Sequence, residues 1–244
     1  MFGTIHIIAL CASAALIALG IVFSRKLSLE TVTKIMFGIG IVSETVKVFT
    51  YTVWNEAKLG GYLPKTDLPF HLCSIQIIFL AILVFSNNKK LHRLLYSFML
   101  PSCLIGALGA LLIPTSSSVG RVCTITFQYF IYHSALIVFA IKLFTAKDLK
   151  FTVRDYFTCL GTLVFILFIA IYINSILYDG ESKINFMYVV DPPQEGLPFL
   201  NKNNGWLSYI LRYGALCLVS VTLVYIKPII TGIAGAVKKS GKKS

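Results

Sequence analysis

Cysteine and histidine side chains are the residues of this sequence best suited to nucleophilic catalysis. A histidine can take the proton of a cysteine thiol, and the resulting thiolate can attack an ester carbonyl. His71 and Cys73 are two residues apart, so on a helix they face nearly opposite directions and make a poor pair. A base for Cys73 must come from another segment, and His133 is the candidate. From spacing alone the pairing is a weak signal, because single Cys and His residues in apolar segments usually serve packing.

The residues before Cys73 are typical of the start of a helix. Asp67 is a candidate N-cap, and Pro69 suits the first turn. Cys73 would then lie just past the first turn, where the positive end of the helix dipole still slightly favours a thiolate.

Further polar residues lie in or beside apolar stretches, where an ionisable group is costly unless it is paired or in a wet cavity. Glu44 and Lys47 are three residues apart, so they share a helix face and can neutralise one another. Arg212 could pair with Glu44, bind a lipid phosphate or extend to the headgroups. The supporting or substrate-binding candidates are His6, Glu44, Lys47, His71, Gln76, Gln128, Asn174 and Arg212.

The composition places these residues in a membrane. Of the 244 residues, 57% are apolar and 13% are charged, whereas a soluble domain carries about 25% charged residues. A soluble enzyme is therefore excluded, and the sequence predicts an all-α, multi-pass protein of the cell membrane. Each span needs about 20 apolar residues. Seven stretches meet this need, namely residues 4–24, 35–54, 68–86, 94–113, 122–144, 156–178 and 206–226.

The distribution of charge predicts the orientation of these seven transmembrane helices. Of the 22 basic residues, 15 lie in loops on one side and five on the other. Basic loops are typical of the cytoplasmic side, so the N-terminus is predicted outside and the C-terminus in the cytoplasm. The net charge of +12 thus reflects topology, and no nucleic-acid partner is expected. We predict a membrane domain over residues 1–230 and a basic cytoplasmic tail over 231–244.

At the predicted depths, most polar residues fall in the outer halves of the spans. They are expected to line one cavity that opens to the outer leaflet or the outside. The loop 179–205 is interpreted equally well as a cap over this cavity or as a plain surface loop. The six cysteines show no metal-type spacing, and neither a metal nor a cofactor is expected.

The string Leu68-Pro69-Phe70-His71-Leu72-Cys73-Ser74 resembles the LPxHLC motif of the YwaF family of integral membrane proteins, which is related to transmembrane protein 164 of animals. Further landmarks extend this resemblance over nearly the whole chain. They are Phe2-Gly3, His6, Glu44, Leu95-Tyr96, Phe130 to His133, Asn174, Asn185 to Tyr188, Pro192-Pro193 and Trp206.

This resemblance implies a cysteine-dependent acyltransferase that acts on membrane phospholipids, with Cys73 as nucleophile and His133 as general base. An acyl-thioester on Cys73 would pass its acyl group to a lysolipid hydroxyl or, as in a lipid hydrolase, to water. By their reach, Gln76 or Gln128 would donate to the oxyanion.

Two other interpretations stay open. The first is a transporter or binding protein for a small polar solute, whose site would use Glu44, Lys47, His71, His133 and Arg212. The second is a structural membrane protein in which polar groups only hold helices together. The oligomeric state is not predicted.

Overall fold

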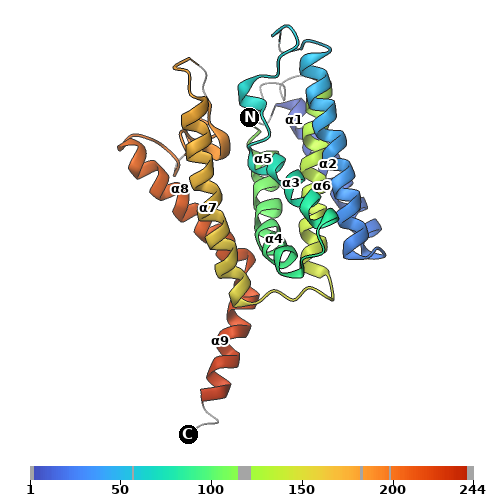
Figure 1. Cartoon of the computed structure of the whole chain (residues 1–244), viewed down its shortest axis with the longest axis vertical. Helices are drawn as coiled ribbons and strands as arrows, with labels where there is room; N and C mark the ends of the chain where they lie inside the picture. The colour runs from blue at the N-terminus through green and yellow to red at the C-terminus, as the bar shows by residue number, and fades with distance from the viewer. Residues whose placement is uncertain (1–2, 57, 115–121, 182–183, 198, 241–244) are drawn as a thin grey trace.

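The computed structural model describes residues 3–56, 58–114, 122–181, 184–197 and 199–240 (Figure 1). Within these residues the regular structure is helical, with no strand, which confirms the predicted all-α class. Two of the elements are 3-10 helices, η1 (Lys65–Asp67) and η4 (Phe186–Tyr188), and η2 (Ser102–Gly106) is a π-helix. The α-helices are α1 (Thr4–Arg25), α2 (Leu29–Thr52), α3 (Leu72–Phe85), α4 (Lys89–Pro101), α5 (Ala107–Leu112), α6 (Thr124–Thr145), α7 (Val153–Leu177), α8 (Gly205–Val224) and α9 (Ile226–Ser240).

Among the described residues, five helical segments are long and apolar enough to cross a membrane: α1, the segment Lys89–Leu112 that joins α4, η2 and α5, and helices α6, α7 and α8. Of the other two predicted spans, α3 is apolar but has 14 residues, fewer than the roughly 20 that a span needs. α2 has 24 residues, but they include Glu30, Lys34, Glu44 and Lys47. Several apolar helices thus support a multi-pass membrane protein, while the count of seven spans and the side of each terminus stay predictions.

Most successive helices run in opposite directions along the long axis of the molecule, except that α5 continues the direction of α4 and α9 that of α8 (Figure 1). We call the end with the loops 53–71 and 178–204 the upper end, and the end with the loops 26–28, 86–88 and 146–152 the lower end. Helices α1 to α6 form one group. Helices α7 and α8 lean away from this group at the upper end, and both contact α4.

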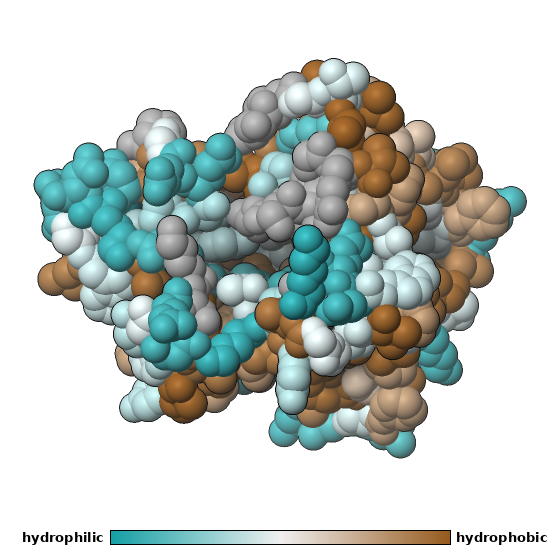
Figure 2. All heavy atoms as spheres, turned by 90° about the horizontal axis from the view of Figure 1, so that it is seen from above, coloured by the Kyte–Doolittle hydropathy of each residue, from teal (hydrophilic) through white to brown (hydrophobic). Residues whose placement is uncertain are grey.

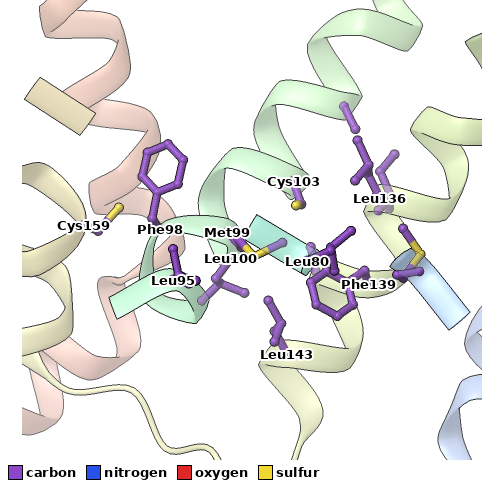
Figure 3. Packing of buried hydrophobic residues seen from close by; sticks show 14 of the residues in the cluster. Leu80, Leu95, Phe98, Met99, Leu100, Cys103, Leu136, Phe139, Leu143 and Cys159 are labelled. Atoms are coloured by element: carbon purple, nitrogen blue, oxygen red, sulfur yellow. The ribbon is translucent and has the colours of Figure 1, made fainter. Parts of the chain in front are cut away.

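The core lies where α4 and η2 pack against α6. Met99, Cys103, Phe139 and Leu143 are fully buried there (Figure 3). By contrast, most apolar side chains of α1 and α8 are exposed, as is usual for helices that face lipid.

A proline interrupts the segment between residues 89 and 112. Pro101 has no N–H, so the carbonyl of Ser97 lacks its usual helical partner. The hydroxyl of Tyr225, at the end of α8, donates to this carbonyl at 2.8 Å, and Tyr225 is fully buried. The chain then continues through the π-helix η2 into α5. The tyrosine thus satisfies a carbonyl that the proline leaves open and attaches α8 to α4.

Hydrogen bonds and charges fix the helix ends at the lower end. Asp155 and Thr152 form a capping box at the start of α7. Arg93 of α4 donates to both carboxylate oxygens of Asp155 at 2.7 Å. The ammonium group of Lys142 donates to the carbonyls of Ser24 and Leu27 just before and after the end of α1. The basic residues here therefore join helices as well as marking the predicted orientation.

Helix α9 extends past the bundle at the lower end (Figure 1). It runs without a break across the boundary that we predict between residues 230 and 231. The division into a membrane domain and a tail stays a prediction.

Candidate functional site

Cys73 is the second residue of α3, because the helix begins at Leu72 and not near Asp67. The N-cap position belongs to His71, whose side chain makes no capping hydrogen bond. Asp67 is instead the last residue of η1. The prediction of the helix start was therefore wrong by a few residues. As a result, Cys73 lies within the first turn, closer to the positive end of the helix dipole than expected.

The first turn of α3 carries hydrogen-bond donors on the thiol-bearing residue and on the next one. They are the backbone N–H groups of Cys73 and Ser74 and the hydroxyl of Ser74. The Cys73 side chain is half-buried, and Ser74 is buried beside it. The first N–H groups of a helix have no partner within the helix, and such groups stabilise negative charge. Our sequence analysis did not find these donors, because they belong mainly to the backbone.

Tyr132 links α6 to Cys73. Its hydroxyl donates to the carbonyl oxygen of Cys73 at 2.9 Å, and its side chain is buried. The sequence analysis missed this role, although Tyr132 lies within the Phe130 to His133 landmark. Neighbouring helix residues point in different directions. The bond therefore brings α6 to Cys73 without by itself aiming the His133 ring at the thiol.

His133 is buried, and a hydrogen bond defines its tautomer. Its Nδ1 lies 2.7 Å from the carbonyl oxygen of Tyr129. Because a carbonyl only accepts, Nδ1 must carry the proton, and Nε2 then has the free lone pair that a base needs. The histidine predicted as base is thus in a suitable tautomer and near the start of α3.

His71 packs under residues of the long loop at the upper end. Its Nε2 is 3.2 Å from the carbonyl oxygen of Thr66, and its ring centroid is 5.0 Å from that of Phe186 and 5.9 Å from that of Tyr188. Phe186 is fully buried and also packs on Phe70. Of the two interpretations of loop 179–205, residues 186–188 therefore match the cap, since they cover the residues just before Cys73.

Side chains of α7 and α8 hold this cap by its backbone. Asn174 exchanges two hydrogen bonds with the backbone of Phe186, at 2.7 and 3.1 Å. The Tyr213 hydroxyl donates to the carbonyl of Met187, and the Tyr209 hydroxyl donates to the carbonyl of Tyr188. The Trp206 indole N–H donates to the carbonyl of Val189. Met187 and Tyr188 have positive φ angles, a conformation that is uncommon for such side chains. Asn174, which was predicted as a site residue, therefore holds the cap in place through the backbone of Phe186.

The predicted pair of Glu44 and Lys47 is confirmed, with an N–O distance of 2.8 Å. Lys47 is buried, and it also donates to the carbonyl oxygen of Asp67 at 2.7 Å. This second bond attaches α2 to the loop that leads into α3. Burial raises the pKa of the Asp67 carboxyl, and the nearby charge of Lys47 opposes this rise.

The two glutamines predicted as oxyanion donors have other partners. Gln76 is fully buried, and its Nε2 donates to the carbonyl of Leu72 and to Ser102. Both of its amide hydrogens are thus engaged, and its Oε1 accepts from the thiol of Cys103. Gln128 donates to Ser43 at 2.6 Å and joins α6 to α2. The backbone donors at the start of α3 are better placed for an oxyanion than Gln76.

Two predicted residues bond to backbone away from Cys73. His6 is buried, and its Nε2 is 2.8 Å from the carbonyl oxygen of Leu111 in α5. Arg212 bonds to Ser208 and to two loop residues, Phe199 and Asn201. The suggested pairing of Arg212 with Glu44 is not found, because Glu44 pairs with Lys47 and Arg212 is occupied by the loop.

The structure thus gathers Cys73, His71, Tyr132 and His133 near the upper end. Seen from that end, hydrophilic residues gather at the middle and left of the face, and hydrophobic residues form the right-hand rim (Figure 2). No group of three or more His, Cys, Asp or Glu side chains in the described ranges could hold a metal ion.

Comparison with known families matches residues 1–225 to the model of the TMEM164 family. This match confirms the relation expected from the motif around Cys73. No curated protein and no solved structure matches the chain.

Proposed function

Because this chain belongs to the TMEM164 family, we propose that it is a cysteine-dependent acyltransferase of the cell membrane that acts on phospholipids. In this proposal the chain spans the membrane seven times, with its N-terminus outside and its C-terminus in the cytoplasm. Cys73 is the nucleophile and His133 the general base, in a site that opens toward the outer leaflet.

The hydrogen bond from Tyr132 to the Cys73 carbonyl is the observation that carries the proposal. It attaches the part of α6 that bears His133 to the residue that bears the thiol. The free lone pair on Nε2 of His133 and the position of Cys73 in the first turn of α3 support the same roles.

The reaction has two steps. First, His133 takes the thiol proton, and the Cys73 sulfur attacks the carbonyl carbon of a phospholipid ester. The N–H groups of Cys73 and Ser74 stabilise the oxyanion. The carbon–oxygen bond then breaks, and the leaving lysophospholipid takes the proton from His133.

In the second step, His133 takes a proton from a lysolipid hydroxyl, and the hydroxyl oxygen attacks the thioester carbonyl. The carbon–sulfur bond breaks, and the Cys73 thiolate takes this proton from His133. With water as acceptor, the products are a free fatty acid and the thiol.

The transporter interpretation receives less support. Its charged residues have partners within the protein, since Lys47 bonds to Glu44 and to the Asp67 carbonyl, and Arg212 bonds to the loop. The structural interpretation predicts that Cys73 can be replaced with no effect beyond stability, so it is tested by the same variant as the enzyme.

The test is lipid turnover by the purified chain in vesicles that hold a phospholipid with a labelled acyl chain and an unlabelled lysophospholipid. We expect the wild type to transfer the label and Cys73→Ala to lose the transfer. Cys159→Ala is the matched control, because Cys159 is a fully buried cysteine of α7 away from α3. Equal transfer by wild type and Cys73→Ala would remove the proposal.

A further inference from the structure

Helix α9 has one strongly apolar face. Ile226, Ile229, Ile230 and Ile233 recur at helical spacing and form a single stripe. Lys227 and Thr231 lie on a different side of the same helix. A helix of this pattern is typical of segments that lie in the interface of a membrane.

Helix α7 packs against α9 at Gly232, and most of the isoleucine stripe is exposed. Gly232 lies so close to α7 that an added Cβ would be 2.5 Å from a methyl carbon of Val153. On the stripe, Ile226 is 50% exposed, and Ile230 and Ile233 are each 60% exposed. Figure 1 shows α9 beyond the lower end of the bundle. Ile229 packs partly against the core, whereas the other three isoleucines of the stripe are exposed.

The charge of this region identifies what covers the stripe. Residues 226–244 contain five lysines and no acidic residue, the lysines being Lys227, Lys238, Lys239, Lys242 and Lys243. Two copies of such a segment would repel one another, whereas an anionic lipid surface would attract it. We propose that α9 binds the anionic surface of the membrane at the lower end, with its isoleucines among the acyl chains and its lysines on the headgroups.

The junction between α8 and α9 allows this arrangement. Pro228 has no N–H to give to the carbonyl of Val224, so the helix loses a bond where α9 begins. Such positions are where helices bend. Tyr225 is held to Ser97, so the end of α8 is fixed where α9 begins.

The test is hydrogen exchange of the backbone amides of α9 in the full-length chain. The protein is placed in nanodiscs of phosphatidylcholine alone and in nanodiscs that also hold phosphatidylglycerol. We expect amides of residues 229–240 to exchange roughly tenfold more slowly with phosphatidylglycerol present. The double variant Ile230→Ser/Ile233→Ser should lose this difference, and Thr231→Ala, on a polar side of the same helix, should keep it.

Two outcomes would overturn the proposal. One is equal exchange of the wild type in the two kinds of nanodisc, a result that does not depend on whether any variant folds. The other is protection that grows with protein concentration and not with anionic lipid, since this would mean that a second copy covers the stripe. The proposal does not rest on acyl transfer, because the measurement involves no turnover.

Discussion

The two ends of the molecule use polar groups in different ways. At the lower end, charged side chains bond to helix ends and to one another, as Arg93 and Lys142 do. At the upper end, α3 begins without a side-chain cap, and its first turn holds a half-buried thiol. Charged groups also join elements at the upper end, where Lys47 bonds to the Asp67 carbonyl, so the thiol in the first turn of α3 is what sets this end apart. At this end, the first N–H groups of α3 have no partner among the carbonyls of the helix, so they and the Cys73 thiol are available for a reaction.

The largest effect that we expect comes from His133 at the upper end. His133→Gln should slow acyl transfer by roughly a hundredfold or more, because the thiol loses its base. Transfer by the reconstituted protein is the measurement. His92→Gln is the control, since His92 also bonds to a carbonyl, that of Ser86, but at the lower end. A similar loss in both variants would mean that the two ends do not differ in the way proposed.

The salt bridge of Arg93 should give the largest effect on stability. Arg93→Met leaves the buried Asp155 without its guanidinium partner and should lower the free energy of unfolding by about 2 kcal/mol, less than for a fully buried pair because Arg93 is half exposed. Lys34→Met removes an exposed pair with Glu30 and should leave stability almost unchanged. Thermal unfolding in detergent compares the two. Equal losses of stability in the two variants would show that the Arg93–Asp155 pair stabilises the lower end no more than an exposed pair does.

The next largest effect on stability is expected from Tyr225. Tyr225→Phe removes the donor to the Ser97 carbonyl, and an unsatisfied buried carbonyl costs about 1–2 kcal/mol. Tyr172→Phe, at an exposed position on α7, should have almost no effect. If both variants unfold at the same temperature as the wild type, another group must satisfy the carbonyl beside Pro101.

The smallest effect that we expect is that of Tyr132→Phe on acyl transfer. Tyr132→Phe removes a hydrogen bond of about 1 kcal/mol and should slow acyl transfer roughly fivefold by loosening the position of Cys73. Tyr129→Phe loses a similar bond from α6 to the carbonyl of Ala110. A greater loss of transfer in Tyr132→Phe, at equal loss of stability, would assign the effect to position. Equal transfer in the two variants would contradict that role.

Local features were predictable from the sequence, and distant contacts were not. The Glu44 and Lys47 pair follows from helical spacing within one element, and the apolar stretches predict most of the helices. The bond between Tyr225 and Ser97 joins residues 128 positions apart, and no local pattern indicates it. The same holds for Gln76, whose partners Ser102 and Cys103 lie on another helix. Ser102 and the Leu72 carbonyl accept the amide hydrogens of Gln76 that were predicted to serve an oxyanion.

The start of α3 shows a further limit. Asp67 and Pro69 are good helix-start residues, yet the helix begins at Leu72. Lys47 binds the carbonyl of Asp67, and Phe186 packs on Phe70 and His71, so partners from α2 and from the cap hold these residues in a loop. Contacts between elements here override local preference. They also move Cys73 into the first turn.

The most direct test of the account is the detection of an acyl group on Cys73. The wild-type protein is incubated with phospholipid, and its cysteine-containing peptides are analysed by mass spectrometry. We predict an acyl-thioester on Cys73 that hydroxylamine removes and that Cys73→Ala lacks. Transfer of acyl chains without any adduct on Cys73, or an adduct spread equally over the other cysteines, would contradict the account.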